Sequence, residues 1–170
     1  MKTPSKVLFV KLAIALVLIV AVMEGLKTSF LLAYDRQAVP SLEYRNALVW
    51  RHGGDIETLE INQVVVFQID ERLEQAFDPG SLFMKRVAGL PGDSVDVKET
   101  GVYINGEHVT DMNQISRIDA DPNKVFRSYT VPEGQVFVLG TTPTSIDSRY
   151  WGTVNQDQIK GTVITLWSKT

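Results

Sequence analysis

The chain has 170 residues, of which 44% are hydrophobic and 22% charged, so it can form one domain with a core and is neither disordered nor collagen-like. Its net charge of −3, without a cluster of lysines and arginines, argues against nucleic-acid binding. Cysteine is absent, which excludes disulfides and thiolate metal sites. We therefore expect one globular domain, whose compartment must be inferred from its topology.

The first feature along the chain is an apolar segment near the amino terminus. Residues 7–23 carry no charge except Lys11, and further lysines precede them. This pattern predicts a transmembrane anchor, which we place at residues 7–33, after a cytoplasmic tail of residues 1–6. Because basic residues mark the cytoplasmic side of a span, residues 34–170 are expected to form an extracytoplasmic domain. The alternative is a cleavable secretory peptide, whose usual ending in small residues this segment matches poorly.

The remainder of the chain has the pattern of a mainly β fold. Beyond residue 62, short β-branched runs alternate with turn residues, and no helical period lasts for three turns. Asn105-Gly106 predicts a type I′ hairpin turn, which needs positive φ at both positions. The polar segment Asp111–Arg127 is expected to lie outside the sheet. The predicted strands are residues 64–67, 82–89, 94–97, 102–104, 136–139 and 162–167.

One of these strands carries a candidate catalytic base. Alternation along residues 82–89 places Phe83, Lys85 and Val87 on one face, so Lys85 points where apolar side chains point. Burial disfavours the ammonium form, and lowering its pKa to near 7 would correspond to about 4 to 5 kcal/mol. The plain alternative is a surface lysine on an exposed strand face. Spacing alone does not decide between the two.

Two sequence blocks resemble the type I signal peptidases. Residues 85–93 (KRVAGLPGD) closely resemble the lysine box of that family, and residues 145–152 (SIDSRYWG) are similar to its carboxy-terminal box. Between them, residues 129–140 (YTVPEGQVFVLG) are similar to the strand and turn that lead into the second box. The resemblance covers roughly residues 64–167 and, given the single anchor and small size, is closest to the TraF-type conjugative-transfer branch. It implies a signal-peptidase-like antiparallel β domain behind one amino-terminal transmembrane helix.

The resemblance also implies a serine endopeptidase with a Ser/Lys dyad. In such a dyad a serine hydroxyl attacks the scissile carbonyl and a neutral lysine takes its proton. Lys85 matches the family base, and Ser145 matches the serine whose hydroxyl orients that lysine. Asp147 and Arg149 match a charged pair that braces the site, and no cofactor is implied. Without the family, Ser145 is a turn serine, and the charged pair is a surface salt bridge worth little.

The nucleophile is where the chain departs from this pattern. The conjugative branch has a serine two residues before a proline and a tyrosine four residues after it. Pro40 and Tyr44 fit that spacing, which puts Ala38 at the nucleophile position. Alanine cannot attack a carbonyl. Ser41 is the serine close by and is our candidate nucleophile, against the plain alternative of a loop serine; an engineered or natural Ser-to-Ala change at position 38 is the other explanation.

The function implied by the resemblance is cleavage of membrane-inserted precursors, such as a signal-peptide-bearing protein, a prepilin or another conjugative-transfer substrate. The expected location is the bacterial inner membrane, as a single-pass protein with its catalytic domain in the periplasm, so the partners are the precursor and the lipid bilayer. One alternative is a catalytically inactive pseudo-peptidase that acts as a binding or assembly scaffold, which Ala38 favours. Another is an unrelated anchored binding module, for which both blocks would have to be coincidental.

The histidines and tryptophans suggest no additional chemistry. His52 and His108 stand apart in the sequence, without a second histidine or a carboxylate at ligand spacing, so no metal site is expected. Trp50, Trp151 and Trp167 are expected to be core or membrane-interface residues.

Overall fold

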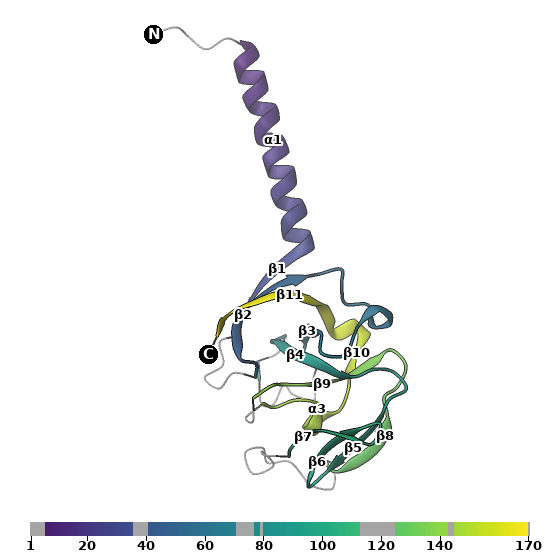
Figure 1. Ribbon diagram of the computed structural model, residues 1–170. Helices are drawn as coiled ribbons and strands as arrows, with labels where there is room; N and C mark the ends of the chain where they lie inside the picture. The colour runs from purple at the N-terminus through teal and green to yellow at the C-terminus, as the bar shows by residue number, and fades with distance from the viewer. Residues whose placement is uncertain are drawn as a thin grey trace.

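A computed structural model describes residues 6–35, 41–70, 77–78, 80–112, 125–142 and 145–169. Figure 1 shows one long helix followed by a β domain. The helices are α1 (Lys6–Ser29), η1 (Ile56–Thr58), α3 (Ser148–Trp151) and η3 (Gln156–Gln158). The strands are β1 (Phe30–Tyr34), β2 (Tyr44–Trp50), β3 (Val64–Gln68), β4 (Leu82–Gly89), β5 (Ser94–Lys98), β6 (Gly101–Ile104), β7 (Glu107–Thr110), β8 (Arg127–Thr130), β9 (Gln135–Leu139), β10 (Val154–Asn155) and β11 (Ile159–Lys169).

Helix α1 stands clear of the domain and buries none of its residues against it. Within the described part of the chain it is the one helix long and apolar enough to cross a membrane. At 1.5 Å per residue it is about 36 Å long, which exceeds a hydrocarbon core of about 30 Å. The helix ends at Ser29, so our boundary at residue 33 is corrected. Phe30–Tyr34 form β1 because they pair with β2. Leu31 and Ala33 of β1 pack against the buried apolar cluster that includes Ala47 and Val49 of β2.

The strands form two antiparallel sheets. A seven-stranded sheet has the order β1-β2-β11-β3-β4-β9-β10, and a four-stranded sheet has the order β7-β6-β5-β8. Buried apolar side chains fill three clusters around them. The mainly β fold with one amino-terminal helix is confirmed. Strand β4 lies inside the larger sheet between β3 and β9, and its middle is therefore well placed to bury a side chain.

Most predicted strands are observed within two residues of their expected ends, and β4 is observed as predicted. The hairpin turn is confirmed, because φ is 53° at Asn105 and 85° at Gly106. Strands β1, β2, β8 and β10 were not predicted. We expected Arg127 to lie outside the sheet, and this was wrong because Arg127 is the first residue of β8. Residues 113–124 of the same polar segment lie outside the described residues.

A tight turn links the two sheets at the end of the lysine block. Gly92 has φ +89°, a value that favours glycine. The carboxylate of Asp93 accepts hydrogen bonds from the Leu90 N–H at 2.7 Å and from the Asn105 side-chain amide at 2.8 Å. The Pro-Gly-Asp end of the block therefore holds the hairpin of the second sheet in place.

Candidate active site

Lys85 lies in the middle of β4, opposite Val65 of β3. Its side chain is 1% exposed and shares a face with Phe83 and Val87, both members of the same apolar cluster. The Nζ atom lies 5.2 Å from the centroid of the Phe83 ring. The alternation argument is confirmed, and the alternative of a surface lysine is wrong.

Burial changes the protonation of this lysine. Desolvation lowers the pKa of Lys85 from its ordinary 10.5 to about 8. The carboxylates of Asp147 and Asp35 act in the opposite direction because they favour the ammonium, while the Arg149 guanidinium lowers the pKa further. A lysine in this range is neutral often enough near neutral pH to accept a proton.

Asp147 and Arg149 form a buried ion pair beside Lys85. The Asp147 carboxylate accepts hydrogen bonds from Arg149 Nε at 2.7 Å and Nη2 at 2.8 Å, and from the Gly140 N–H at 2.9 Å. Arg149 also donates to the backbone carbonyls of Ser145 at 3.2 Å and Asp111 at 2.8 Å. Both side chains are buried, so the alternative of a surface salt bridge is wrong. A pair that is hydrogen-bonded to its own block and to two other segments can brace the site, the role that the resemblance implies.

Local sequence explains how these two residues are brought together. Asp147 is the N-cap of α3, and its side chain accepts the Arg149 N–H at 3.3 Å. Gly152 ends this short helix with φ +96°. Ser148, buried in the same turn, accepts the Val138 N–H at 2.9 Å and so fastens α3 to β9. The carboxy-terminal block is therefore a short helix held against the strand next to Lys85.

Ser145 opens that block and is buried, yet its Oγ has no hydrogen-bond partner among the described residues. The hydrogen bond to Lys85 that the resemblance implies is therefore not formed in this structure. A buried hydroxyl without a partner is uncommon and costs free energy. It leaves Ser145 with a donor and lone pairs available to a lysine, a water molecule or a substrate.

Gly140 brings Ser145 and Ser41 close together. A Cβ on Gly140 would overlap the Ser145 side chain and lie 2.6 Å from the Ser41 carbonyl oxygen. That carbonyl accepts the Thr141 N–H at 2.9 Å, and the Ser41 side chain is buried. The structure thus places Ser41 beside the carboxy-terminal block. Ala38 lies outside the described residues.

Two contributors to this arrangement were missed in the sequence. Asp35 follows β1 and lies close enough to Lys85 to raise its pKa, although 50 residues separate the two in the chain. No local pattern around Asp35 indicates this, because the contact depends on how the sheet folds. Gly140 does carry a signal: a glycine directly after an apolar strand often marks a close backbone approach.

The histidines take no part in the site. His108 Nε2 lies 3.2 Å from Asp111 Oδ1, so it does have a neighbouring carboxylate, contrary to our expectation. The His52 ring contacts Trp50 edge-on at 5.2 Å. Within the described ranges, no three metal-ligating side chains gather.

Comparison with known proteins agrees with the two blocks. A family model described as "Signal peptidase, peptidase S26" matches residues 6–168. The chain belongs to the peptidase S26 signal peptidase family. "Probable signal peptidase I-1" of Synechocystis is 34% identical over 166 residues, which cover 93% of this chain and 82% of the relative. By its family the chain is a serine protease, a hydrolase of the signal peptidase I type.

Other signal peptidases match over shorter stretches. "Probable signal peptidase I-2" of Synechocystis is 34% identical over 75% of this chain, and "Signal peptidase IB" of Staphylococcus aureus is 30% identical over 69%. The chain spans 52% and 63% of those two relatives. The crystal structure of a signal peptidase I from Enterococcus faecalis is 30% identical, with a TM-score of 0.40, over 63% of this chain and 97% of that one.

Proposed function

We propose that this signal peptidase cleaves precursor proteins inserted in the membrane that holds α1, with Lys85 as general base. One observation carries the proposal: Lys85 is buried, has a pKa lowered to about 8, and lies beside the braced block of Ser145, Asp147 and Arg149. A neutral amine in an apolar site can take the proton of an attacking hydroxyl, and an ammonium cannot. Ser145 supplies the hydroxyl that would orient the amine.

The nucleophile of the proposed Ser/Lys dyad is a serine on the segment between β1 and β2. Ser41 is supported by its burial and by the bond from Thr141 that holds it beside Ser145. Ala38 lies at the position that the conjugative-transfer pattern gives to the nucleophile. A serine at residue 38 would therefore supply the hydroxyl if Ser41 does not.

The proposed setting is a bacterial inner membrane with the β domain in the periplasm. The lysines before the apolar run favour this orientation. A tethered site meets a tethered precursor at high effective concentration. Through the conjugative-transfer resemblance, the proposed precursors include pilins or other transfer proteins besides proteins with ordinary signal peptides.

Ala38 also favours a second candidate function, a pseudo-peptidase that binds precursors without cutting them. Such a protein would keep the brace of Asp147 and Arg149 for stability. Burying an amine costs free energy. A protein that only binds precursors would gain nothing in return for that cost, so the buried Lys85 favours the enzyme.

The deciding experiment compares four full-length chains and one control variant in lipid vesicles with a membrane-inserted precursor. We expect Ala38→Ser to cleave faster than the unmodified chain, and Lys85→Met in either background to abolish cleavage. Lys98→Met, a change at an exposed lysine on β5, is the matched control and should leave the rate unchanged.

Ser41→Ala distinguishes the two candidate nucleophile positions, residues 41 and 38. If the unmodified chain cleaves and Ser41→Ala stops it, Ser41 is the nucleophile. If no chain cleaves, even with serine at 38, while the precursor still binds, the pseudo-peptidase replaces the enzyme. Retained cleavage in Lys85→Met would contradict the dyad altogether.

A further inference from the structure

The smaller sheet contacts the brace, the buried ion pair of Asp147 and Arg149, at the end of its edge strand β7. Arg149 Nη1 donates to the backbone carbonyl of Asp111, the residue directly after β7, at 2.8 Å. The two residues are 38 positions apart in the chain, and the Arg149 side chain is 2% exposed. A buried guanidinium needs acceptors for its N–H groups, because an unsatisfied buried donor costs free energy. The contact therefore holds one side of a charged group that lies beside Lys85.

The other bonds of this guanidinium stay within the carboxy-terminal block. Nε and Nη2 donate to the Asp147 carboxylate, and Nη2 also donates to the Ser145 carbonyl. Among the described residues, Asp111 is the acceptor that reaches Arg149 from the smaller sheet. If Asp111 moved, Nη1 would lose its acceptor unless the guanidinium moved with it.

Several contacts fix the end of β7. Thr110 pairs with Val102 of β6, and the register of the two strands shifts beside this pair. A shift of this kind re-aims the residues next to it. His108 Nε2 lies 3.2 Å from Asp111 Oδ1, and Met112 packs against the second buried apolar cluster. The carbonyl that receives Arg149 therefore has a defined position.

Gly101 permits the close approach of β6 and β7 at this end. Its φ of +146° favours glycine. A Cβ on Gly101 would lie 2.6 Å from the Thr110 carbonyl oxygen and 2.7 Å from His108 Nε2. Both distances are much shorter than a van der Waals contact. A side chain at this position would therefore displace the end of β7.

The turn at the other end of the same hairpin is tied to the lysine block. The Asn105 side-chain amide donates to the Asp93 carboxylate at 2.8 Å, and its oxygen accepts the Ser94 N–H at 2.9 Å. Asp93 is the last residue of the block that begins with Lys85. The β6–β7 hairpin therefore connects the two blocks, because its turn holds the end of one and its base holds Arg149 of the other.

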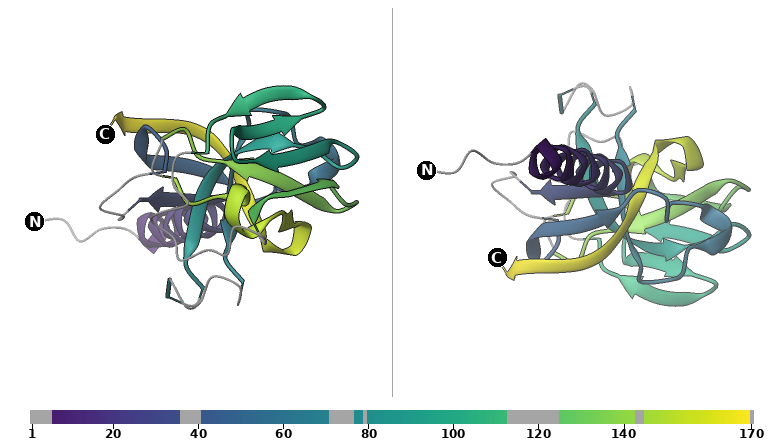
Figure 2. Two further views of the ribbon diagram at one scale, coloured as in Figure 1. Left: turned by 90° about the horizontal axis from the view of Figure 1, so that it is seen from below. Right: turned by 90° about the horizontal axis from the view of Figure 1, so that it is seen from above.

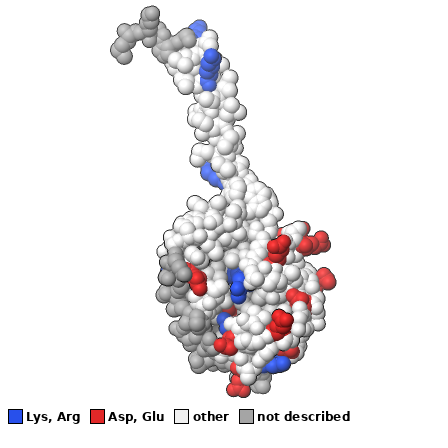
Figure 3. Space-filling view, in the orientation of Figure 1, with Lys and Arg blue, Asp and Glu red and all other residues white. Residues whose placement is uncertain are grey.

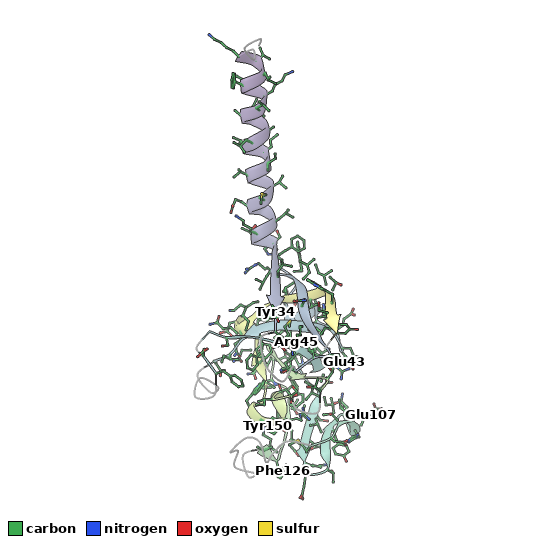
Figure 4. All side chains as sticks on the ribbon, turned by 90° about the vertical axis from the view of Figure 1, so that its left-hand side faces the viewer. Tyr34, Glu43, Arg45, Glu107, Phe126 and Tyr150 are labelled. Carbon is green, nitrogen blue, oxygen red and sulfur yellow. The ribbon has the colours of Figure 1, made fainter. Side chains whose placement is uncertain are left out.

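The figures show where this hairpin lies. In Figure 4, Tyr150, the neighbour of Arg149, and Glu107, the first residue of β7, both lie in the half of the domain farther from Tyr34 and the helix. In both views of Figure 2, the smaller sheet lies to one side of α1. The hairpin thus reaches the brace from the half of the domain that is farther from the helix.

We propose that the β6–β7 hairpin positions Arg149 for catalysis through the Asp111 carbonyl, with Gly101 and Asp111 as positioning residues. The proposal rests on the proposed function of Lys85 as general base. The hairpin acts on that lysine through the brace, which gives the smaller sheet a part in the reaction.

Displacing Asp111 should make Lys85 a weaker base at neutral pH. Arg149 lowers the pKa of Lys85, whereas Asp147 raises it. If the end of β7 moves away, the guanidinium moves with its acceptor, so its positive charge lies farther from Lys85 and compensates Asp147 less. Both changes raise the pKa of Lys85.

The test compares two alanine substitutions in the same hairpin. Gly101→Ala presses on the Thr110 carbonyl. Gly106→Ala is the matched control, because its φ of +85° also favours glycine but a Cβ there meets nothing within 4 Å. Neither substitution changes a charge. This matters because acidic side chains predominate on the face of the β domain in Figure 3, and a gained or lost charge would itself shift the pKa of the lysine.

Two measurements report on Lys85. Nuclear magnetic resonance of isotope-labelled lysines titrates the amine in the full-length chain in detergent micelles, and the Lys85→Met chain identifies its signal. Cleavage rates between pH 6 and 10 are measured in the Ala38→Ser background. We expect Gly101→Ala to raise both midpoints by about half a pH unit or more, which lowers the rate at pH 7 about threefold. The rate at pH 10 should be unchanged, and Gly106→Ala should match its parent chain.

Two outcomes would overturn the proposal. One is a Lys85 midpoint in Gly101→Ala equal to that in Gly106→Ala. The other is a rate that falls by the same factor at pH 7 and pH 10, because general damage to the site does not depend on the protonation of one lysine. A failure of the proposed function is recognised separately: if Lys85→Met still cleaves, or if no chain cleaves, the general base is contradicted, while the resonance titration still tests the hairpin.

Gly101→Ala should fold, because β7 is an edge strand with mostly exposed side chains. If it does not, Gly101→Ala/His108→Ala removes the overlap with the imidazole and leaves the Thr110 carbonyl to move. Its control is Gly106→Ala/His108→Ala. The same difference in the Lys85 midpoint is expected between these two chains, and equal midpoints would refute the proposal.

Discussion

Gly140 and Ser145 are in such close contact that no side chain fits on Gly140. A Cβ there would overlap Ser145 and also press on the Ser41 carbonyl oxygen. One glycine thus sets the distance between the carboxy-terminal block and the segment that carries the candidate nucleophile.

We expect Gly140→Ala to push these segments apart, to lower the cleavage rate and to cost about 1 to 3 kcal/mol of stability, as overpacking does. Gly25→Ala is the control, because a Cβ on Gly25 meets nothing within 4 Å. Rates and urea unfolding of both variants check this. Normal cleavage by Gly140→Ala would show that the contact does not position the site.

The pKa of Lys85 predicts a pH dependence of activity. Because the base must be neutral, cleavage should rise about tenfold per pH unit below pH 8 and level off above it. Initial rates between pH 6 and 10, in a chain whose nucleophile is present, measure this. A midpoint near the ordinary 10.5 would contradict a buried base.

Stability should depend on the same group. The folded pKa lies below the unfolded value, so the unfolded chain binds more protons between pH 8 and 10.5, and stability rises across that window. Lys85→Met removes the penalty and should stabilise the fold by up to about 3 kcal/mol below pH 8, with the gain vanishing near pH 10.5. Lys98→Met, at an exposed lysine on β5, is the control. Urea unfolding at pH 7 and pH 10.5 separates the two outcomes.

Asp147→Asn should affect both stability and the pH profile. It leaves the Arg149 guanidinium buried without its carboxylate, which costs about 3 to 5 kcal/mol. It also removes a charge that raises the pKa of Lys85, so the rise in activity should move to lower pH. Asp96→Asn, at a half-buried carboxylate that pairs with Lys98 on β5, is the control.

Asp35→Asn provides the same electrostatic test with the buried ion pair intact, in case Asp147→Asn fails to fold. Asp35 also raises the pKa of Lys85, so its loss should shift the profile in the same direction. An unshifted profile in every folded variant would mean that these carboxylates do not act on the lysine.

The topology is checked with reporters. A phosphatase that works only outside the cytoplasm should be active when fused after Thr170 and inactive when fused before Met1, because lysines precede the span. The reverse pattern would invert the orientation, and a mature chain that starts near Glu24 would indicate a cleaved leader instead of an anchor.

The sequence was most informative where short-range patterns decide the structure. The apolar run predicted α1, and alternation along β4 predicted the buried face of Lys85, because both depend on residues only a few positions apart. Strand β1 was hidden because its residues are apolar on both sides, so that it extended the anchor pattern without alternating. Leu32 and Tyr34 stay exposed on the side of β1 that faces away from the core, and this is the physical reason for that ambiguity.

The site could be predicted in part. The two blocks named Lys85, Ser145, Asp147 and Arg149, but their burial and contacts depend on segments far away in the chain, such as the Asp111 carbonyl that receives Arg149. The contribution of Asp35 arises in the same way from the curvature of the sheet. The residues on either side of each position do not indicate such contacts.

The passage from α1 into β1 has no linker: the helix ends at Ser29, the strand begins at Phe30, and the Arg51 N–H donates to the Ser29 carbonyl at 2.9 Å. The helix and the sheet should therefore turn together as a lever. Bilayers of different thickness change the tilt of a spanning helix. A change of tilt would move the domain and change the distance between Lys85 and the bilayer. Lipid composition would then influence which peptide bond of a precursor is cleaved.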